Sequence, residues 1–209
     1  MTYQAIDVGC ENGRVIEAYI KEYLPMWMGD YKVTRLDIDP KSKPDILHDI
    51  REPMPKEMLG KYDYVHFTHV LEHMSWRKAV PVFKNVAALT APGGFFLIAV
   101  PSLEYACREI VRGNCDLGLM GMLYGGQDDD FAYHNSGFTR PALEMMTRQI
   151  GFNTYSFKET DIIVYIDGKQ HHGKQHELML RNPAAPVAVE ERQPVVVTKR
   201  ARRRKNAKK

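Results

Sequence analysis

The chain has 209 residues and a mass of 24.0 kDa, enough for one domain and a short tail. Hydrophobic residues make up 44% and charged residues 26%, which is normal for a soluble globular protein. No apolar run approaches the length of about 18 residues that a membrane span needs, so we expect no contact with a membrane. The N-terminus also lacks the pattern of a signal peptide.

The three cysteines, Cys10, Cys107 and Cys115, follow no spacing typical of metal sites or disulfide frameworks, and their number is odd. This usage is typical of proteins from a reducing compartment. We therefore predict a cytoplasmic protein.

Charge is divided unevenly along the chain. Residues 181–209 hold ten Lys or Arg and two Glu, a net charge of +8, whereas residues 1–180 carry −5. The basic segment has three prolines and no aromatic residue, so it buries too little apolar surface to offset its ordering entropy. We predict a domain over 1–180 and a disordered basic tail over 181–209.

The first half of the chain alternates strand-like and helix-like patterns. In chain order, the pattern predicts a strand at 3–9, a helix at 13–24, and strands at 31–39, 45–50 and 62–70. The polar residues of interest fall where these strands end.

The second half continues the alternation after a break. A helix is predicted over 77–94, ended by Pro92, Gly93 and Gly94, and an apolar strand over 95–101. Residues 102–139 then interrupt the rhythm with glycines, methionines and three consecutive aspartates. The remaining predicted elements are a helix at 140–152 and strands at 153–166 and 175–181, with a hairpin turn favoured at Asp167-Gly168.

Strand–helix alternation with near-continuous apolar strands favours an α/β fold of the doubly wound, Rossmann-like kind, with a mostly parallel sheet. In such sheets, ligands bind beyond the carboxyl ends of the strands. The candidate polar residues and glycines at predicted strand ends are Asp7, Gly9, Gly13, Asp37, Asp39, Asp49, Thr68, His69, Glu72 and His73.

These residue types suit a ligand that contains a nucleoside. A glycine turn lets the backbone approach a ligand closely, and a carboxylate after the second strand can accept hydrogen bonds from both ribose hydroxyls. The sequence has neither G-x-x-x-x-G-K-[ST] nor G-x-G-x-x-G, so ATP and NAD lack their usual fingerprints.

Six stretches in this order resemble class I S-adenosylmethionine-dependent methyltransferases, in particular the small, type 11-like ones with a "vLEH" segment. The resemblance covers roughly residues 4–152 and extends to about 180 with the last two strands. The matching stretches are "AIDVGCENGR", "RLDID", "PDILHDI", "YDYVHFTHVLEH", "LTAPGGFFLIAVPS" and "HNSGFTRPALEMMTRQIGF". The family fold is a seven-stranded sheet whose last strand is antiparallel.

The resemblance implies a set of contacts with S-adenosylmethionine. Asp37 would bind the ribose hydroxyls and Asp49 the adenine amino group. The other implied contacts are Asp7, Gly9, Cys10 and Gly13 around the methionine part, Ile38 and Ile50 near the adenine, and Thr68 and His69 along the pocket wall.

The sequence departs from the family in one loop position. The middle glycine of the first loop is replaced by Glu11, whose side chain has to turn away from the cofactor carboxylate or bind an amine. The chain also starts directly at the first strand, so we expect residues 102–139, or another chain, to hold the substrate.

Histidines in two segments are candidates for contact with the methyl acceptor. His134 is a candidate base or acceptor contact, or an ordered loop histidine; His73 is a candidate acceptor contact, or fixes its loop. The aspartates at 128–130 beside His134 favour a solvated acidic loop over a metal site, and the histidines at 171, 172 and 176 favour an exposed turn over a zinc site. We therefore predict no metal.

The sequence predicts an enzyme that moves a methyl group from S-adenosylmethionine to an oxygen or nitrogen atom of an unidentified acceptor. The alternative is a Rossmann-like binding or assembly module that acts through its basic tail. The eight basic residues in 199–209 predict contact with nucleic acid or another polyanion, or else only solubilise the protein. Both interpretations of the tail are open.

Overall fold

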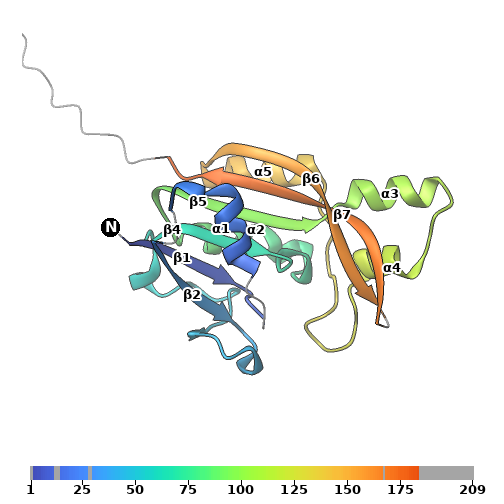
Figure 1. Ribbon diagram of the computed structural model, residues 1–209, viewed down its shortest axis with the longest axis horizontal. Helices are drawn as coiled ribbons and strands as arrows, with labels where there is room; N and C mark the ends of the chain where they lie inside the picture. Colours follow the sequence, from blue (N-terminus) through green and yellow to red (C-terminus); the bar gives the residue numbers. More distant parts are fainter. Residues whose placement is uncertain (1, 12–14, 28–29, 167, 184–209) are drawn as a thin grey trace, which may run out of the picture.

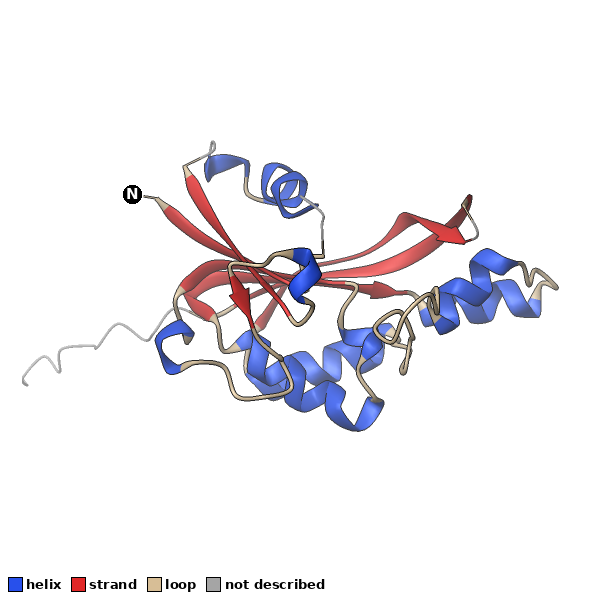
Figure 2. Cartoon of the chain, turned by 90° about the horizontal axis from the view of Figure 1, so that it is seen from below, coloured by secondary structure: helices blue, strands red, loops and turns tan. Residues whose placement is uncertain are grey.

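The computed structural model describes residues 2–11, 15–27, 30–166 and 168–183. Seven strands form one sheet, and helices cover both of its faces (Figure 1, Figure 2). The strands are β1 (Tyr3–Val8), β2 (Tyr31–Asp37), β3 (Ile46–Leu47), β4 (Tyr62–Thr68), β5 (Thr90–Pro101), β6 (Asn153–Ile166) and β7 (Lys169–Arg181). The α-helices are α1 (Val15–Tyr23), α2 (Trp76–Ala87), α3 (Leu103–Val111), α4 (Leu117–Tyr124) and α5 (Arg140–Ile150). Short 3-10 helices are η1 (Pro25–Trp27), η2 (Pro40–Ser42), η3 (Lys56–Met58) and η4 (Leu71–His73).

The strand order is β3-β2-β1-β4-β5-β7-β6. Neighbours from β3 to β5 pair in parallel, whereas β7 runs antiparallel to both β5 and β6. The predicted Rossmann-like fold, with its mostly parallel sheet and antiparallel last strand, is confirmed. Because the chain reverses strand order beside β1, the carboxyl ends of β1, β2 and β4 meet at one edge.

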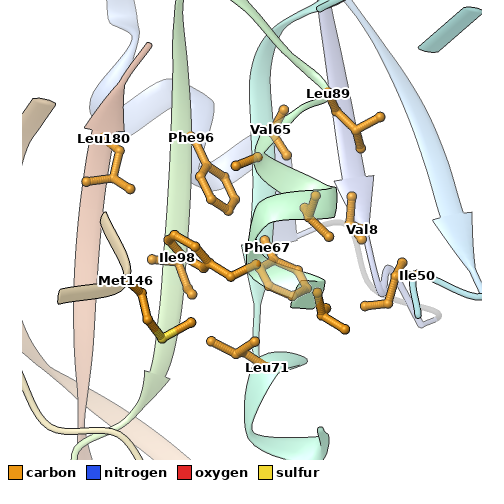
Figure 3. Close-up of a cluster of buried hydrophobic side chains, with 14 of the residues drawn as sticks. Val8, Ile50, Val65, Phe67, Leu71, Leu89, Phe96, Ile98, Met146 and Leu180 are labelled. Carbon is orange, nitrogen blue, oxygen red and sulfur yellow. The ribbon is translucent and has the colours of Figure 1, made fainter. Parts of the chain in front are cut away.

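Apolar side chains fill both faces of the sheet. The larger cluster lies between the sheet and helices α2 and α5, where Phe96 packs 5.3 Å from Phe83 and 6.1 Å from Phe67 between ring centroids (Figure 3). The smaller cluster packs Ile16 and Ile20 of α1 onto the opposite face. Burial on both faces explains why the central strands read as continuous apolar runs.

Two predicted boundaries are wrong. The strand expected over 45–50 forms ladder bonds only at Ile46–Leu47, so Asp49 lies in the loop beyond it. The helix expected over 77–94 is α2, which ends at Ala87, and the segment Pro92–Gly94 belongs to β5.

Close backbone contact explains why glycine occurs inside β5. A Cβ atom on Gly94 would lie 2.9 Å from the carbonyl oxygen of Ala91 and 3.0 Å from that of Asp63. The pairing of β4 with β5 shifts register at this point, between Tyr62 and Tyr64. The Pro-Gly-Gly run is thus an irregularity within a strand. Proline and glycine inside strands occur mainly at such bulges.

The segment that interrupted the sequence pattern contains two helices. In α4, Gly118 and Gly121 lie against the far end of the β6–β7 hairpin, where a Cβ on Gly118 would meet His171 Cβ at 2.2 Å. Figure 1 shows α3 and α4 beyond the sheet body, beside the end of β7. Helical periodicity is weak here because α4 is apolar on all sides.

The final hairpin is longer than predicted. Pairing of β6 with β7 begins at Ile166 and Lys169, around the predicted turn, whose Asp167 lies outside the described residues. The three histidines expected in an exposed turn therefore lie within β7, and His176 is buried. His176 is buried because β7 pairs with β5 and β6 on either side there, and residues 175–180 are all buried.

Some predictions fall outside the part of the chain that the structure describes. These are the start of the helix at 13–24, Gly13 itself, and the basic tail from residue 184 onward. None of the helices within the described ranges is long and apolar enough to span a membrane.

Candidate functional site

A pocket of about 840 Å³ opens at the edge where β1, β2 and β4 end. Its walls come from the loops after these strands and from the segment that precedes α5. This volume is in the range of sites for drug-sized ligands, about 300–1,000 Å³. The pocket therefore lies where an open α/β sheet places its ligand.

Asp37, the last residue of β2, lines the pocket and is held by two backbone hydrogen bonds. Asp37 is only 7% exposed, and its Oδ2 accepts a hydrogen bond of 2.9 Å from the backbone N–H of Glu11. Its Oδ1 accepts another of 2.9 Å from the N–H of Asp39. These two bonds fix the carboxylate between the first two loops, and Oδ1 keeps a lone pair for a ligand.

The first loop turns sharply because two residues adopt left-handed conformations. Gly9 has φ +77°, and a Cβ there would lie 2.2 Å from Val70 Cγ2. Glu11 follows with φ +43°, its N–H held by Asp37 and its side chain exposed at the pocket. Glu11 therefore shapes the loop through its backbone and leaves its carboxylate free to face a ligand.

The loop after β3 brings Asp49 and Ile50 to the pocket. Arg51 binds the Asp49 carboxylate through Nε at 2.8 Å and Nη2 at 2.7 Å, and this hydrogen-bonded cation lowers the pKa of Asp49. Asp49 is thus both a turn carboxylate and a pocket residue. Ile50 offers a buried apolar surface beside it.

The residues after β4 form a chain of side-chain contacts. His69 Nε2 lies 2.7 Å from Gln175 Oε1 on β7, and its Nδ1 lies 3.3 Å from Glu72 Oε1. Glu72 is 2% exposed; burial raises its pKa, but the hydrogen bond and charge of His69 outweigh that effect and lower it. Glu72 is therefore a buried carboxylate that remains ionised.

Two histidines complete this wall. His73 Nδ1 lies 3.1 Å from the carbonyl oxygen of Tyr133, and His134 Nδ1 lies 2.9 Å from that of Met122. Their rings meet edge to face with centroids 4.9 Å apart. Burial lowers the pKa of His134, so its ring is neutral near pH 7.

The predicted site residues divide into two groups. Eight of them line the pocket: Gly9, Asp37, Ile38, Asp49, Ile50, His69, His73 and His134. Three others do not line it. Asp7 is buried within β1, Cys10 Sγ lies 3.8 Å from Asp37 Oδ2, and Thr68 Oγ1 lies 2.9 Å from His66 Nε2.

Sequence reasoning missed several residues that shape the site. Val70 packs where a Gly9 side chain would be, and Arg51 pairs with Asp49. Of the aspartates at 128–130, predicted as a solvated acidic loop, Asp129 and Asp130 line the pocket, and Asp129 Oδ1 accepts hydrogen bonds from backbone N–H groups of its own turn. An x-D-x-R spacing hints at the ion pair, but no sequence signal places Val70 over Gly9.

Comparisons with solved structures find methyltransferases. The chain is similar to the 1,6-didemethyltoxoflavin-N1-methyltransferase of Burkholderia thailandensis, solved with 1,6-didemethyltoxoflavin and S-adenosylhomocysteine. Identity is 16% and the TM-score 0.56, over 87% of this chain and 72% of that one. A search among curated proteins found no match.

Two further structures show the same likeness. A SAM-dependent methyltransferase of Methanosarcina mazei has 11% identity and a TM-score of 0.60, over 88% of this chain and 94% of that one. The N-methyltransferase NodS of Bradyrhizobium japonicum, solved with S-adenosylhomocysteine, has 14% identity and a TM-score of 0.52, over 87% and 78%. At such identities these structures establish the fold.

The family follows from the sequence itself. The methyltransferase domain family matches residues 4–156, which is well over half of the chain. The matched region begins in β1 and contains all the strand ends that form the pocket. The chain therefore belongs to the methyltransferase domain family.

Proposed function

We propose that the protein transfers a methyl group from S-adenosylmethionine to an oxygen or nitrogen atom of an acceptor molecule. The observation that carries this proposal is the Asp37 carboxylate, fixed at the end of β2 and facing a pocket of about 840 Å³. The relatives solved with S-adenosylhomocysteine support the same cofactor class.

The residues present fit this cofactor. Asp37 is placed to accept hydrogen bonds from ribose hydroxyls, while Ile38 and Ile50 offer apolar surface to an adenine ring. The pocket wall also holds carboxylates at Glu11 and Asp49. An acidic wall suits a ligand whose amine and sulfonium are both cationic.

The bound cofactor supplies a methyl group made electrophilic by the positive sulfur. The acceptor atom forms the new bond to carbon as the carbon–sulfur bond breaks, its electron pair stays on sulfur, and the acceptor loses a proton. The protein then mainly has to hold acceptor and methyl group in line. We assign the acceptor side to the wall that carries His73 and His134, since Gly9, Asp37 and Asp49 line the pocket from other loops.

The two histidines suit that side chemically. Their Nδ1 atoms face carbonyl oxygens, which only accept hydrogen bonds, so Nδ1 carries the proton in the neutral ring. Each Nε2 then keeps a lone pair. For His134 we propose a role as base or acceptor contact, and for His73 as acceptor contact.

Calorimetry with S-adenosylhomocysteine tests the proposal. We expect the wild-type protein to bind it and the Asp37→Ala variant to bind at least about 10-fold more weakly, because a hydrogen bond to a charged group is worth about 1.5–3 kcal/mol. Asp45→Ala is the matched control: Asp45 Oδ2 also accepts a backbone N–H, that of Arg35 at 2.8 Å, but the residue does not line the pocket.

Two results would count against a methyltransferase. One is the absence of binding by the wild-type protein at high micromolar S-adenosylhomocysteine. The other is equal loss of affinity in the Asp37 and Asp45 variants. Mass spectrometry of the ligand retained on purification gives an independent answer, since a bound sulfonium or its demethylated product identifies the cofactor without an acceptor.

We also propose a cytoplasmic location. The three cysteines support it because Cys10, Cys107 and Cys115 are all free thiols, as a reducing compartment requires. The proposed contact of residues 199–209 with nucleic acid stays a prediction, since that segment lies outside the described residues.

A further inference from the structure

We propose that Glu72, His73 and His134 form a binding site for a divalent first-row transition metal ion at the acceptor side of the pocket. One ligand atom from each of these residues lies within 4.8 Å of the other two. The site joins two parts of the chain, because Glu72 and His73 belong to η4 whereas His134 precedes α5 by several residues.

The ring nitrogens of both histidines are oriented as metal ligands are. Each Nδ1 is occupied by a backbone carbonyl, that of Tyr133 for His73 and that of Met122 for His134. This arrangement fixes the ring and leaves the Nε2 lone pair free, which is how proteins usually hold a histidine that binds a metal.

Glu72 provides an independent observation. Its carboxylate is 2% exposed, and its Oε2 has no hydrogen-bond partner among the described residues. A buried carboxylate oxygen without a partner is costly, and its desolvation is offset when a cation binds. His69 meets only Oε1, at 3.3 Å.

The backbone holds the two halves of the site together. Asn135 and Ser136 donate their N–H groups to the carbonyl oxygen of Glu72, at 2.8 and 3.1 Å. The Asn135 side chain donates to the carbonyl oxygen of His73 at 2.9 Å, and Ser136 Oγ to that of Met74 at 2.8 Å. These four bonds hold together the two backbone segments that carry the three ligands.

The cluster is also reachable. His73 and His134 line the main pocket, and Glu72 and His134 line a second cavity of about 20 Å³ behind it, room for one water-sized particle. At ligand distances near 2 Å, three ligand atoms separated by up to 4.8 Å have to move inward by at most about 1 Å each. Side-chain rotation supplies such a movement.

The ligand set indicates the class of ion. Two imidazole nitrogens and one carboxylate oxygen suit Zn²⁺, Mn²⁺, Fe²⁺ or Co²⁺, whereas Mg²⁺ and Ca²⁺ prefer ligand sets made of oxygen atoms. Three protein ligands leave at least one coordination position open. This open position can face the main pocket, which His73 and His134 line.

The role of the ion rests on the proposed function, and it replaces the base role of His134, whose Nε2 lone pair the ion would occupy. A hydroxyl oxygen of the acceptor that binds at the open position loses its proton more readily, because the cation stabilises the oxyanion. The proton passes to solvent, the oxyanion attacks the methyl carbon, and the electron pair of the broken carbon–sulfur bond stays on sulfur. The acceptor class that fits is therefore a molecule with a hydroxyl group.

Metal titration of the untagged full chain after EDTA treatment and dialysis tests the site. Calorimetry with Zn²⁺ and visible absorption with Co²⁺ should show one high-affinity ion per chain. Glu72→Gln, His73→Gln and His134→Gln should each weaken binding by at least about 10- to 100-fold, the loss seen even for residues that only support a ligand. His172→Gln removes an exposed histidine of β7 and should bind as the wild type does.

A wild-type protein that takes up neither Zn²⁺ nor Co²⁺ at high micromolar concentration would overturn the site, as would variants that bind like the wild type. Circular dichroism shows whether each variant is folded. Should the variants unfold, pulsed electron paramagnetic resonance of the Mn²⁺-loaded wild type decides: nitrogen couplings from coordinated imidazole support the site, and their absence refutes it.

The outcome is separable from that of the proposed function. S-adenosylhomocysteine binding, measured in the presence of EDTA, depends on Asp37 and its loop and not on the metal ligands. Metal uptake without cofactor binding would refute methyl transfer and leave the metal site intact. Cofactor binding without metal uptake would refute the metal site and leave the proposed methyl transfer intact.

Discussion

The carboxyl group of Asp7 is buried inside β1, with 4% of the residue exposed. Burial raises its pKa from 3.8 to about 7, although the charge of Arg35 opposes the rise. In the unfolded chain the group ionises near pH 3.8, so between that pH and about 7 only the folded protein keeps the proton. The contribution of Asp7 to stability is therefore full below this range and is lost as pH rises through it.

The Asp7→Asn variant has no proton to lose in this range. The free energy of unfolding of the variant minus that of the wild type should rise by up to about 4 kcal/mol between about pH 4 and about pH 8. The reason is that one pKa unit corresponds to about 1.4 kcal/mol. Urea unfolding at several pH values measures the difference, with the exposed Asp45→Asn as control. A difference that does not change with pH would contradict the prediction.

Glu11 is the residue whose role the sequence left most open. The structure places its backbone in the loop through the Asp37 contact and leaves its side chain exposed at the pocket. A carboxylate there is placed to attract the amine of the proposed cofactor.

We expect Glu11→Gln to keep the fold and to weaken S-adenosylhomocysteine binding by about 2- to 10-fold, the size of one partly exposed ion pair. Calorimetry at low and high salt is the measurement, and the loss should shrink as salt screens the charge. Asp128→Asn removes a similar charge that does not line the pocket and should leave affinity unchanged. Tighter binding by the Glu11 variant would show that the side chain obstructs the site.

Site residues at strand ends could be predicted from the sequence, whereas residues that a long loop brings together could not. Asp37 and His69 could be found because the end of a buried parallel strand is visible in the sequence, and such ends meet at one edge. The partnership of Glu72 with His134 could not, since it depends on how the loop after α4 returns to η4. No local pattern encodes that return.

The turn between β1 and α1 depends on one close contact. Gly9 combines φ +77° with a space that Val70 Cγ2 fills, at 2.2 Å from where a Cβ would lie. Gly60 has a similar φ of +64°, but a Cβ there would meet nothing within 4 Å. The two glycines therefore separate the effect of backbone strain from that of crowding.

Gly60→Ala should lower the free energy of unfolding by about 1–2 kcal/mol, the strain of a left-handed alanine. Gly9→Ala should lower it by a further 1–3 kcal/mol or so because of overpacking, and should weaken S-adenosylhomocysteine binding as well. Denaturant unfolding and calorimetry measure both effects. In the Gly9→Ala background, Val70→Ala should recover part of the lost affinity; equal effects of the two alanines would show that crowding is unimportant.

Elements were predictable where burial imposes a regular pattern. The central strands and α5 agree with the sequence patterns because their apolar faces are set by packing on the sheet. The extent of β5 and the presence of α3 and α4 were missed. In β5, backbone crowding at Gly94 overrides the usual meaning of Pro-Gly-Gly, and α4 packs through glycines that read as breakers.

Across the whole molecule, the charge of the body and that of the tail have opposite signs. Residues 1–180 carry −5 and residues 181–209 carry +8. The acidic body presents its carboxylates at the pocket, which favours a cationic cofactor and disfavours a polyanion there. We therefore expect any contact with nucleic acid to be made by the tail and not by the pocket.

Removal of residues 184–209 separates cofactor binding by the body from nucleic-acid binding by the tail. We expect the shortened chain to keep the wild-type affinity for S-adenosylhomocysteine, because the pocket-wall residues that the structure describes all lie between Gly9 and Asn135. Single-stranded nucleic acid should bind the full chain with an affinity that falls steeply with salt, since each phosphate neutralised contributes about −0.7 to the logarithmic slope. The shortened chain should lose this binding.

A tail in which the basic residues of 199–209 are changed to glutamine is the sharper variant, because it keeps the length and removes only the charge. Fluorescence anisotropy with a labelled oligonucleotide at several salt concentrations compares the three proteins. Binding that survives the loss of charge would place the contact on the body, against its net charge of −5. Absence of binding by the full chain would leave the tail as a solubilising segment, because phosphate contact at low salt needs little more than eight accessible cations.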